Sequence, residues 1–222
     1  DCYVYASPIL SNCPQSKSKV CSYKVYLAQI YEEKIINCEK HINDQIIGVD
    51  PKLAETLVEN ALISNCFTSL KNIKKYRREA ALGNSRFDFI GIDENNKYFI
   101  LEVKNVPLSD FADVNYVEKK KLLKADAFKN MKYNEKISYF PDGYRKTKEG
   151  VVSERALKHI NELAAVTLSN IIRPIICFVI QRTDSGSFQA SNIDPTYKEA
   201  FNNAVKKGVA VIILMIEWTA TG

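Results

Sequence analysis

The sequence predicts an α/β protein in which a mixed central sheet is flanked by helices, with a small β-rich region at the N-terminus. Three observations predict it. Two strand patterns, residues 86–92 and 97–103, are joined by a short polar turn. Apolar strand patterns then alternate with amphipathic helix patterns to the end of the chain. Ahead of both, Asp50-Pro51 has the residue types of a helix start and separates an N-terminal stretch of different character.

The composition is that of a globular protein and excludes a mostly disordered or fibrous chain. The chain has 222 residues, of which 46% are hydrophobic and 26% charged. Its 31 Lys and Arg residues against 26 Asp and Glu residues give a net charge of +5, which permits a polyanionic partner without requiring one. The longest wholly apolar run, 209–216, is far shorter than the roughly 20 residues of a membrane helix. We therefore expect no membrane span.

The six cysteines and two histidines are not spaced as ligands of a structural zinc ion. No Cys-x-x-Cys pair occurs, and His41 and His159 are far apart. Four cysteines fall within the first 38 residues, which leaves an N-terminal disulfide open, but reduced packing thiols are favoured. We expect an intracellular protein, cytoplasmic or nuclear. Because the chain begins at Asp1 and not at Met, a removed targeting segment stays an open alternative.

The elements follow in order from local patterns. Residues 1–50 alternate short β-leaning runs with polar turns, and apolar residues then recur at helical spacing to about residue 64. We expect a β-rich region of residues 1–50 and a main domain of residues 51–222. Residues 73–80 are typical of a charged edge strand.

The strand at 86–92 alternates in a way that predicts which side chains share a face. With a period of two, Phe87 and Phe89 lie on one face, and Arg86, Asp88 and Ile90 lie on the other.

The second half continues with a charged segment and then with clear helices and strands. Residues 108–139 form a charged insertion, with a helix expected at about 117–131. A helix at 155–168 follows the N-cap residue Ser153, and a second begins at Asp194-Pro195. The apolar runs 175–181 and 209–217 are strands, and Gly208 ends the helix between them.

The residues Asp88, Glu102 and Lys104 carry the strongest indication of chemistry. Glu102 and Lys104 are two positions apart on one strand, so their side chains emerge on the same face. If Asp88 faces the same way, two carboxylates repel each other, and a divalent cation between them removes the repulsion. Two oxygen ligands plus water suit Mg²⁺ or Mn²⁺. Lys104 would then orient or help deprotonate a water for attack on a phosphodiester.

The alternative is that these residues have only a structural role, because a Glu-x-Lys pair on a strand is commonly a solvent-facing ion pair. Both strands are apolar enough to be central, where three charged groups are costly without a task. From spacing alone, the structural alternative stays the more common one.

The wider pattern resembles a known family. Asp-x(n)-Glu-x-Lys across a hairpin is the signature of PD-(D/E)XK nucleases. The runs that resemble the sugar fermentation stimulation protein A (SfsA) family are GNSRFDFI, YFILEVKNV, YFPDG, SERALKHINEL, IICFVIQR and IDPTYKEAFNNAVKKGVAVI, in that order. That family is similar to PD-(D/E)XK nucleases in its C-terminal domain and has an N-terminal OB-like barrel, and its members are described as DNA-binding proteins.

The resemblance implies that Asp88 and Glu102 ligate Mg²⁺ or Mn²⁺ and that Lys104 is the catalytic lysine. It also brings four further residues into the neighbourhood of the site: Arg86, Asp142, Arg155 and His159. We expect the basic members of this set to bind nucleic acid.

Two departures from the family's pattern bear on substrate choice. Residues 1–50 lack the family's Asn-Thr-Gly run, with Asn12-Cys13-Pro14-Gln15 near its place, so the OB-like barrel is expected to be truncated or remodelled. The insertion of residues 108–139 separates the catalytic strand from Phe140-Pro141-Asp142, and Gly143 replaces the family's Ala. It would place a Lys-rich flap near the groove, with phosphate contacts from Lys119, Lys120, Lys121 and Lys124.

The leading hypothesis is a Mg²⁺-dependent, nuclease-like protein that binds DNA and cleaves phosphodiesters. Its chief rival is a DNA-binding, regulatory module of the sugar fermentation stimulation type that does not cleave. A third hypothesis, an interaction module on a degenerate nuclease scaffold, is disfavoured because Asp88, Glu102 and Lys104 are all present. Nothing in the sequence indicates the oligomeric state.

Overall fold

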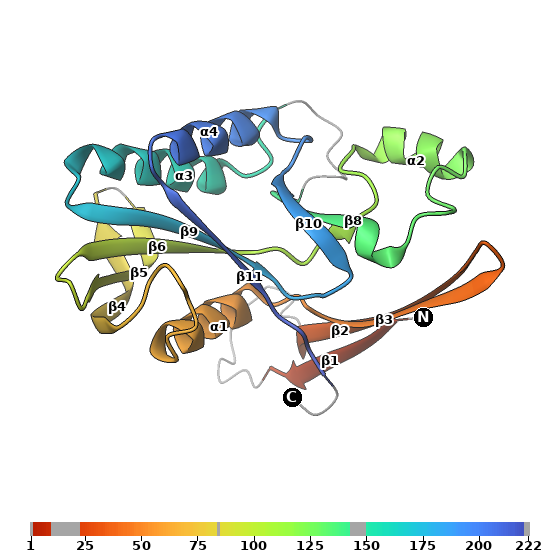
Figure 1. Ribbon diagram of the computed structural model, residues 1–222, viewed down its shortest axis with the longest axis horizontal. Coiled ribbons are helices and arrows are strands. Elements are labelled where there is room, and N and C mark those ends of the chain that lie inside the picture. Colours follow the sequence, from red (N-terminus) through yellow and green to blue (C-terminus); the bar gives the residue numbers. More distant parts are fainter. Residues whose placement is uncertain (1, 10–22, 84, 143–149, 220–222) are drawn as a thin grey trace, which may run out of the picture.

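The structure, a computed structural model, describes residues 2–9, 23–83, 85–142 and 150–219. Within these residues it contains three sheets and four α-helices. Figure 1 shows the largest sheet with α1, α3 and α4 towards one end of the molecule, and the two small sheets with α2 towards the other.

The largest sheet has five strands in the order β11-β9-β6-β5-β4. In chain order these are β4 (Ile73–Leu82), β5 (Ser85–Asp93), β6 (Tyr98–Asn105), β9 (Ile172–Ile180) and β11 (Ala210–Met215). The first three form an antiparallel meander, whereas β6, β9 and β11 run parallel and are joined by helical crossovers. The predicted α/β class, with a mixed sheet flanked by helices, is confirmed.

Three helices cover this sheet, and each begins at the residue type that predicts a helix start. They are α1 (Pro51–Ile63), α3 (Glu154–Val166), which a 3₁₀ turn η2 (Thr167–Ser169) extends, and α4 (Pro195–Lys206). The side chains of Asp50, Ser153 and Asp194 accept hydrogen bonds from backbone N–H groups of the first turns. These caps satisfy donors that a helix end otherwise leaves unpaired.

The sheet has an apolar core on each face. One core lies between the sheet and α1, and the other between the sheet and the pair α3 and α4. Successive residues of β9 alternate between them, with Ile175, Cys177 and Val179 facing α1, and Ile176, Phe178 and Ile180 facing α3 and α4. Burial on both faces explains why β9 is apolar at nearly every position.

The predicted alternation of β5 is wrong at one point. Phe87 packs in the core under α3 and α4, whereas Phe89 packs in the core under α1, so the two rings lie on opposite faces. Glu79 of β4 falls between the residues paired with Phe87 and Phe89, and its φ is 47°. The register of β4 with β5 continues across Glu79. The ladder between β5 and β6, however, ends at Phe89, so Phe87 lies where β5 is paired on one side only and a strict period of two is not imposed.

The N-terminal region forms a three-stranded antiparallel sheet in the order β1-β2-β3. Its strands are β1 (Cys2–Pro8), β2 (Tyr23–Ile36) and β3 (Glu39–Gly48). The expected Asn12-Cys13-Pro14-Gln15 turn lies outside the described residues. The OB-like barrel and the division into two domains stay predictions.

Residues 108–139 are more structured than the expected solvated insertion. They include β7 (Ser109–Asp110), α2 (Tyr116–Lys124), the 3₁₀ turn η1 (Tyr133–Glu135) and most of β8 (Lys136–Phe140). β8 pairs with β7 and, in parallel, with β10 (Ser185–Ala190). The expected helix of 117–131 ends early because Asp126 has a φ of 52°, which a right-handed helix does not accommodate.

A buried ion-pair network joins the sheet of β7, β8 and β10 to the hairpin of β2 and β3. Asp184 is 4% exposed and accepts hydrogen bonds from Arg182 at 2.6 Å, Lys136 at 2.9 Å and Asn43 at 2.9 Å. Lys136 also pairs with Glu32 at 2.8 Å. Burial alone would raise the pKa of Asp184, but Arg182 and Lys136 outweigh it and hold that pKa well below its usual range.

The described cysteines are free thiols. Of these, Cys177 is buried, which raises its pKa to about 12, whereas Cys2, Cys38 and Cys66 are exposed. Cys13 and Cys21 lie outside the described residues, so the N-terminal disulfide is untested. No helix in the described part of the chain has the length and apolar character to cross a membrane.

Asp184→Asn is expected to lower the free energy of unfolding by about 3 kcal/mol, because it leaves the buried Arg182 without its anion and Lys136 with Glu32 alone. The measurement is a urea titration at pH 7. The contribution of Asp184 should be lost as pH falls below about 4, the pKa of an unfolded Asp. Lys40→Ala, which breaks an exposed pair with Glu33, is the control and should leave the midpoint near that of the wild type. A midpoint for Asp184→Asn equal to that of Lys40→Ala would contradict the importance of the network.

Candidate metal and catalytic site

The carboxylate of Asp88 lies where β5 and β6 stop pairing. The antiparallel ladder between the two strands runs from Ile92↔Tyr98 to Phe89↔Leu101 and goes no further. Beyond it, the backbone N–H of Val103 donates to Asp88 Oδ2 at 2.6 Å. The Asp88 carboxylate thus takes the place of the backbone acceptor that a continued ladder would supply, and it lies where the two strands separate.

Glu102 is the most buried member of the site, with 2% of its surface exposed. Both Lys104 Nζ and His159 Nδ1 contact its Oε1 atom. Lys104 and Glu102 share a face, as their spacing predicts. The second oxygen, Oε2, is buried and has no hydrogen-bond partner among the described residues. A buried acceptor without a donor is costly, so this atom is suited to an additional ligand.

The two carboxylates have different charge states near neutral pH. Burial, followed by the proximity of Glu102, raises the pKa of Asp88 to about 7, despite the Val103 N–H and Lys104. Burial would also raise the pKa of Glu102, but His159 and Lys104 outweigh it and hold that pKa below its usual value. Glu102 is therefore ionised at neutral pH, whereas Asp88 is only partly ionised near pH 7.

These residues fit a hard divalent cation. Burial and then repulsion from Glu102 disfavour the ionised form of Asp88, and Oε2 of Glu102 has no partner; a cation that accepts carboxylate oxygens relieves both the repulsion and the missing partner. No group of three or more His, Cys, Asp or Glu side chains is arranged to hold a metal within residues 2–9, 23–83, 85–142 and 150–219. Two protein carboxylates would thus leave the remaining positions to water or substrate, as Mg²⁺ commonly does.

Two helices close the site from one side. His159 of α3 is 5% exposed, and its ring packs against Phe87 with a centroid separation of 5.9 Å. Tyr197 of α4 is fully buried, and its hydroxyl has no hydrogen-bond partner among the described residues. Burial and then the charge of Glu102 raise the Tyr197 pKa, so its hydroxyl stays protonated. Sequence reasoning missed Tyr197, because an aromatic residue on an amphipathic helix is usually a packing residue.

The structure brings only part of the predicted set together. Arg86 is exposed and pairs with Glu79 at 3.2 Å, and Arg155 is exposed in the first turn of α3. Asp142 is exposed just after β8. His159 is buried against Glu102 and is not at the surface. Contact of these residues with nucleic acid stays a prediction.

The four predicted lysines of α2 have different environments. Lys119 pairs with Asp110, and Lys120 lies over the Tyr116 ring at 4.5 Å. Lys121 and Lys124 are exposed. Figure 1 shows α2 at the opposite end of the molecule from β4 and β5. Whether these lysines contact phosphates stays a prediction.

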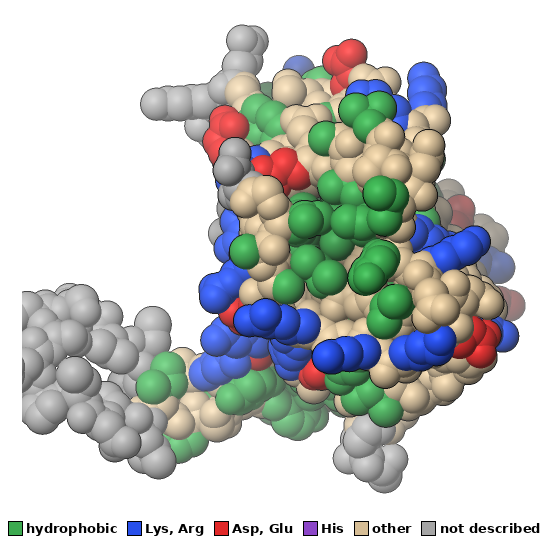
Figure 2. Space-filling model, turned by 90° about the vertical axis from the view of Figure 1, so that its left-hand side faces the viewer, with side chains coloured by type: hydrophobic (Ala, Val, Ile, Leu, Met, Phe, Trp, Pro, Cys, Tyr) green, Lys and Arg blue, Asp and Glu red, His purple; other side chains and the backbone are tan. Residues whose placement is uncertain are grey.

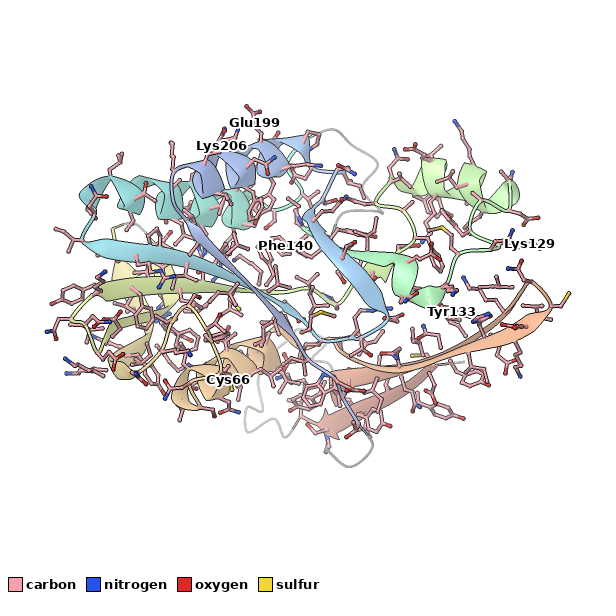
Figure 3. The ribbon with its side chains drawn as sticks, viewed as in Figure 1. Cys66, Lys129, Tyr133, Phe140, Glu199 and Lys206 are labelled. Carbon is pink, nitrogen blue, oxygen red and sulfur yellow. The ribbon has the colours of Figure 1, made fainter. Side chains whose placement is uncertain are left out.

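A cleft of about 770 Å³ lies away from the site, between the hairpin of β2 and β3 and the segment after α2. Lys34, Lys40 and Lys129 are among the residues that line it. Figure 3 shows Lys129 and Tyr133 at this end of the molecule. None of the candidate catalytic residues lines this cleft, so it is separate from the site.

Comparison with known proteins decides the family. The sequence profile described as "Sugar fermentation stimulation protein RE domain" matches residues 52–117 and 127–222. The chain belongs to the SfsA family. Within this SfsA-family chain, the profile leaves out residues 118–126, which include all four predicted lysines of α2.

Relatives and a solved structure agree with this assignment. The chain is 31% identical over 171 residues to the sugar fermentation stimulation protein homolog of Clostridium novyi, covering 76% of this chain and 60% of the relative. It is 30% identical over 184 residues to the homolog of Roseobacter denitrificans, covering 82% and 65%. The chain thus spans less than two thirds of the length of these curated relatives. The solved structure of Pyrococcus furiosus SfsA has the same fold, with a TM-score of 0.63 at 18% identity over 96% of this chain and 71% of that chain.

Asp88→Asn is expected to stabilise the metal-free protein at pH 8. The Asp88 pKa is about 7 in the folded protein and about 4 in an unfolded chain. The folded state therefore binds this proton more tightly, and stability falls as pH rises between the two values. Asn removes that loss, on the order of 2 to 4 kcal/mol, and its amide oxygen still accepts the Val103 N–H.

The measurement is urea unfolding in EDTA at pH 8 and at pH 4, where the two proteins should differ little. Glu94→Gln makes the same change of charge at an exposed turn and is the matched control. If Asp88→Asn behaves like Glu94→Gln at both pH values, the buried repulsion is not present.

Proposed function

We propose that this SfsA-family protein is a divalent-metal-dependent, nuclease-like protein that binds DNA and hydrolyses phosphodiester bonds. The observation that carries the proposal is that Asp88 accepts a hydrogen bond from the backbone N–H of Val103, the residue next to Glu102, while the Lys104 ammonium contacts the Glu102 carboxylate. Two such acids and a lysine at the separated ends of neighbouring strands are suited to phosphodiester hydrolysis. The net charge of +5 is compatible with a polyanionic substrate.

Asp88 and Glu102 would hold Mg²⁺ or Mn²⁺ through carboxylate oxygens, and Oε2 of Glu102 is free to serve. When bound, such an ion polarises the scissile phosphate and lowers the pKa of a bound water. The P. furiosus relative was solved in complex with Ca²⁺, another cation that prefers oxygen ligands.

Lys104 supplies fixed positive charge beside the two acids. Its side chain is 13% exposed, so a substrate phosphate can reach it while bulk water is largely kept away. In this position the ammonium donates to the attacking water or to the oxygens that gain charge as phosphorus becomes five-coordinate. Such preorganised donors act in a site of low dielectric and therefore contribute strongly to catalysis.

His159 acts as a positioning residue for Glu102. Because the ionised carboxylate only accepts hydrogen bonds, the contact requires a proton on His159 Nδ1. This contact fixes Oε1 and leaves Oε2 to the cation. Partners that orient a metal-binding side chain in this way typically affect metal affinity by about 10- to 100-fold.

Lys104→Ala is expected to slow the Mg²⁺-dependent nicking of supercoiled plasmid DNA by about two or more orders of magnitude. Affinity for DNA should change far less, because one lysine is a small part of a phosphate-binding surface. Lys206→Ala, a change of an exposed residue near the end of α4, is the control and should nick at the wild-type rate.

The same assay separates the proposal from its rival. Wild-type protein that binds DNA without nicking it in Mg²⁺ or Mn²⁺ would indicate the non-cleaving, regulatory binding module instead. Equal losses of binding and nicking in Lys104→Ala would also favour that module.

His159→Leu is expected to weaken Mn²⁺ binding by about 10- to 100-fold, whereas His159→Asn should retain most of it. The Asn amide can donate from nearly the position of Nδ1, whereas Leu cannot donate. The measurement is a Mn²⁺ titration followed by electron paramagnetic resonance, with melting temperatures as a check on folding. If Leu and Asn weaken Mn²⁺ binding equally, His159 only fills space.

A further inference from the structure

The outer strand of the large sheet, β4, is strongly basic. It carries Lys74, Lys75, Arg77 and Arg78 within five positions, at the edge next to β5. Figure 2 shows Lys and Arg side chains gathered along the lower part of the end of the molecule that lies on the left in Figure 1. Charge on an edge strand commonly blocks pairing with another chain, so the question is whether β4 does more than that.

The two faces of β4 are neutralised differently. Arg78 faces α1 and pairs with Glu59 at 2.7 Å and with Glu55 at 3.1 Å. Lys75 and Arg77 occupy the alternate positions and project from the other face. Both are exposed, and neither has an acidic partner in the described part of the chain. If the charges of β4 served only to keep this edge in contact with water, the cations on its two faces would have no reason to differ in their acidic partners.

The unneutralised face is also the face of the candidate catalytic site. Arg77 is opposite Ile90, and Ile90 is opposite Ile100. Ile100 and Glu102 are two residues apart on β6, so they share a face and lie in neighbouring rows of side chains. Arg77 is in the row of Ile100 and therefore lies one row from Glu102. Lys75 lies one row further, in register with Ile92 and the half-exposed Tyr98.

Local carboxylates do not neutralise these cations. Glu79, on the same strand, pairs with Arg86. In the turn between β5 and β6, Asp93 accepts hydrogen bonds from two backbone N–H groups of the turn itself. Glu94 of that turn has no ion pair with either β4 residue. A phosphate backbone would supply the missing negative charge and release counterions from DNA.

We propose that Lys75 and Arg77 form a phosphate-binding strip that carries a DNA backbone across β4 towards the Asp88–Glu102 site. The two side chains are about 7 Å apart along the strand, so they contact different phosphates of one backbone. Tyr98 offers an exposed aromatic surface at the outer end of the strip. Backbone contacts position DNA without reading its sequence. The inference rests on the proposed function and adds the path of the substrate.

The test is a salt titration of a fluorescent DNA duplex in EDTA, where binding is measured without cleavage. The double variant Lys75→Ala/Arg77→Ala should flatten the dependence of log affinity on log salt by about 1.8 units, since each contact with duplex DNA contributes roughly 0.9. The loss should be the same for unrelated duplex sequences.

The control is Lys206→Ala/Lys207→Ala, which removes the same charge at the end of α4. Figure 3 shows Lys206 on α4, a different element from the edge strand β4 that carries Lys75 and Arg77. Its slope should equal that of the wild type. The variant Lys75→Gln/Arg77→Gln keeps polar side chains at the surface and should repeat the result if the Ala variant is unstable.

The outcomes are distinct. A wild-type slope in the β4 variants, or an equal change in the α4 control, would overturn the strip while leaving DNA binding intact. No binding of DNA by the wild type would overturn the proposed function and the strip together.

Discussion

The burial of the Glu102 carboxylate is the constraint on which the rest of the site depends. An ionised group with 2% exposure is costly unless charged or hydrogen-bonding partners compensate it. Lys104 comes from the same strand and His159 from α3, and both contact the same carboxylate oxygen, Oε1. The other oxygen therefore remains a buried acceptor. The helix α3 packs on the sheet where its histidine reaches this carboxylate, so the packing of the core also positions the site.

The separation of β5 and β6 brings the second acid to the first. Once the ladder ends at Phe89↔Leu101, the Val103 N–H needs an acceptor, and Asp88 supplies it. This contact holds Asp88 beside the strand of Glu102, where burial and then the charge of Glu102 raise the pKa of Asp88. The unfavourable charge pair is thus built into the backbone geometry. Strain of this kind is common where a protein is arranged to bind a ligand and not to be most stable without it.

The sequence predicts those features that depend on short-range chemistry. Asp50, Ser153 and Asp194 identify helix starts because an N-cap is a local hydrogen bond. The opposite orientation of Phe87 and Phe89 was not predictable, because it falls where β5 leaves its ladder with β6, and no local pattern marks that point. β8 and β10 are short, and they become strands by pairing with each other and, in the case of β8, with β7. The contact of His159 with Glu102 joins residues 57 positions apart, which no local pattern contains.

The most direct test of the central claim, that Asp88 and Glu102 form one cation site, is calorimetric titration with Mn²⁺ in two buffers of different ionisation enthalpy at pH 7. A cation that binds both carboxylates must displace the proton that Asp88 holds at this pH. The wild type should bind one Mn²⁺ and release about half a proton, falling towards zero at pH 8.5. Mn²⁺ binding without proton release at pH 7, or binding unchanged in Asp88→Asn/Glu102→Gln, would contradict the shared site.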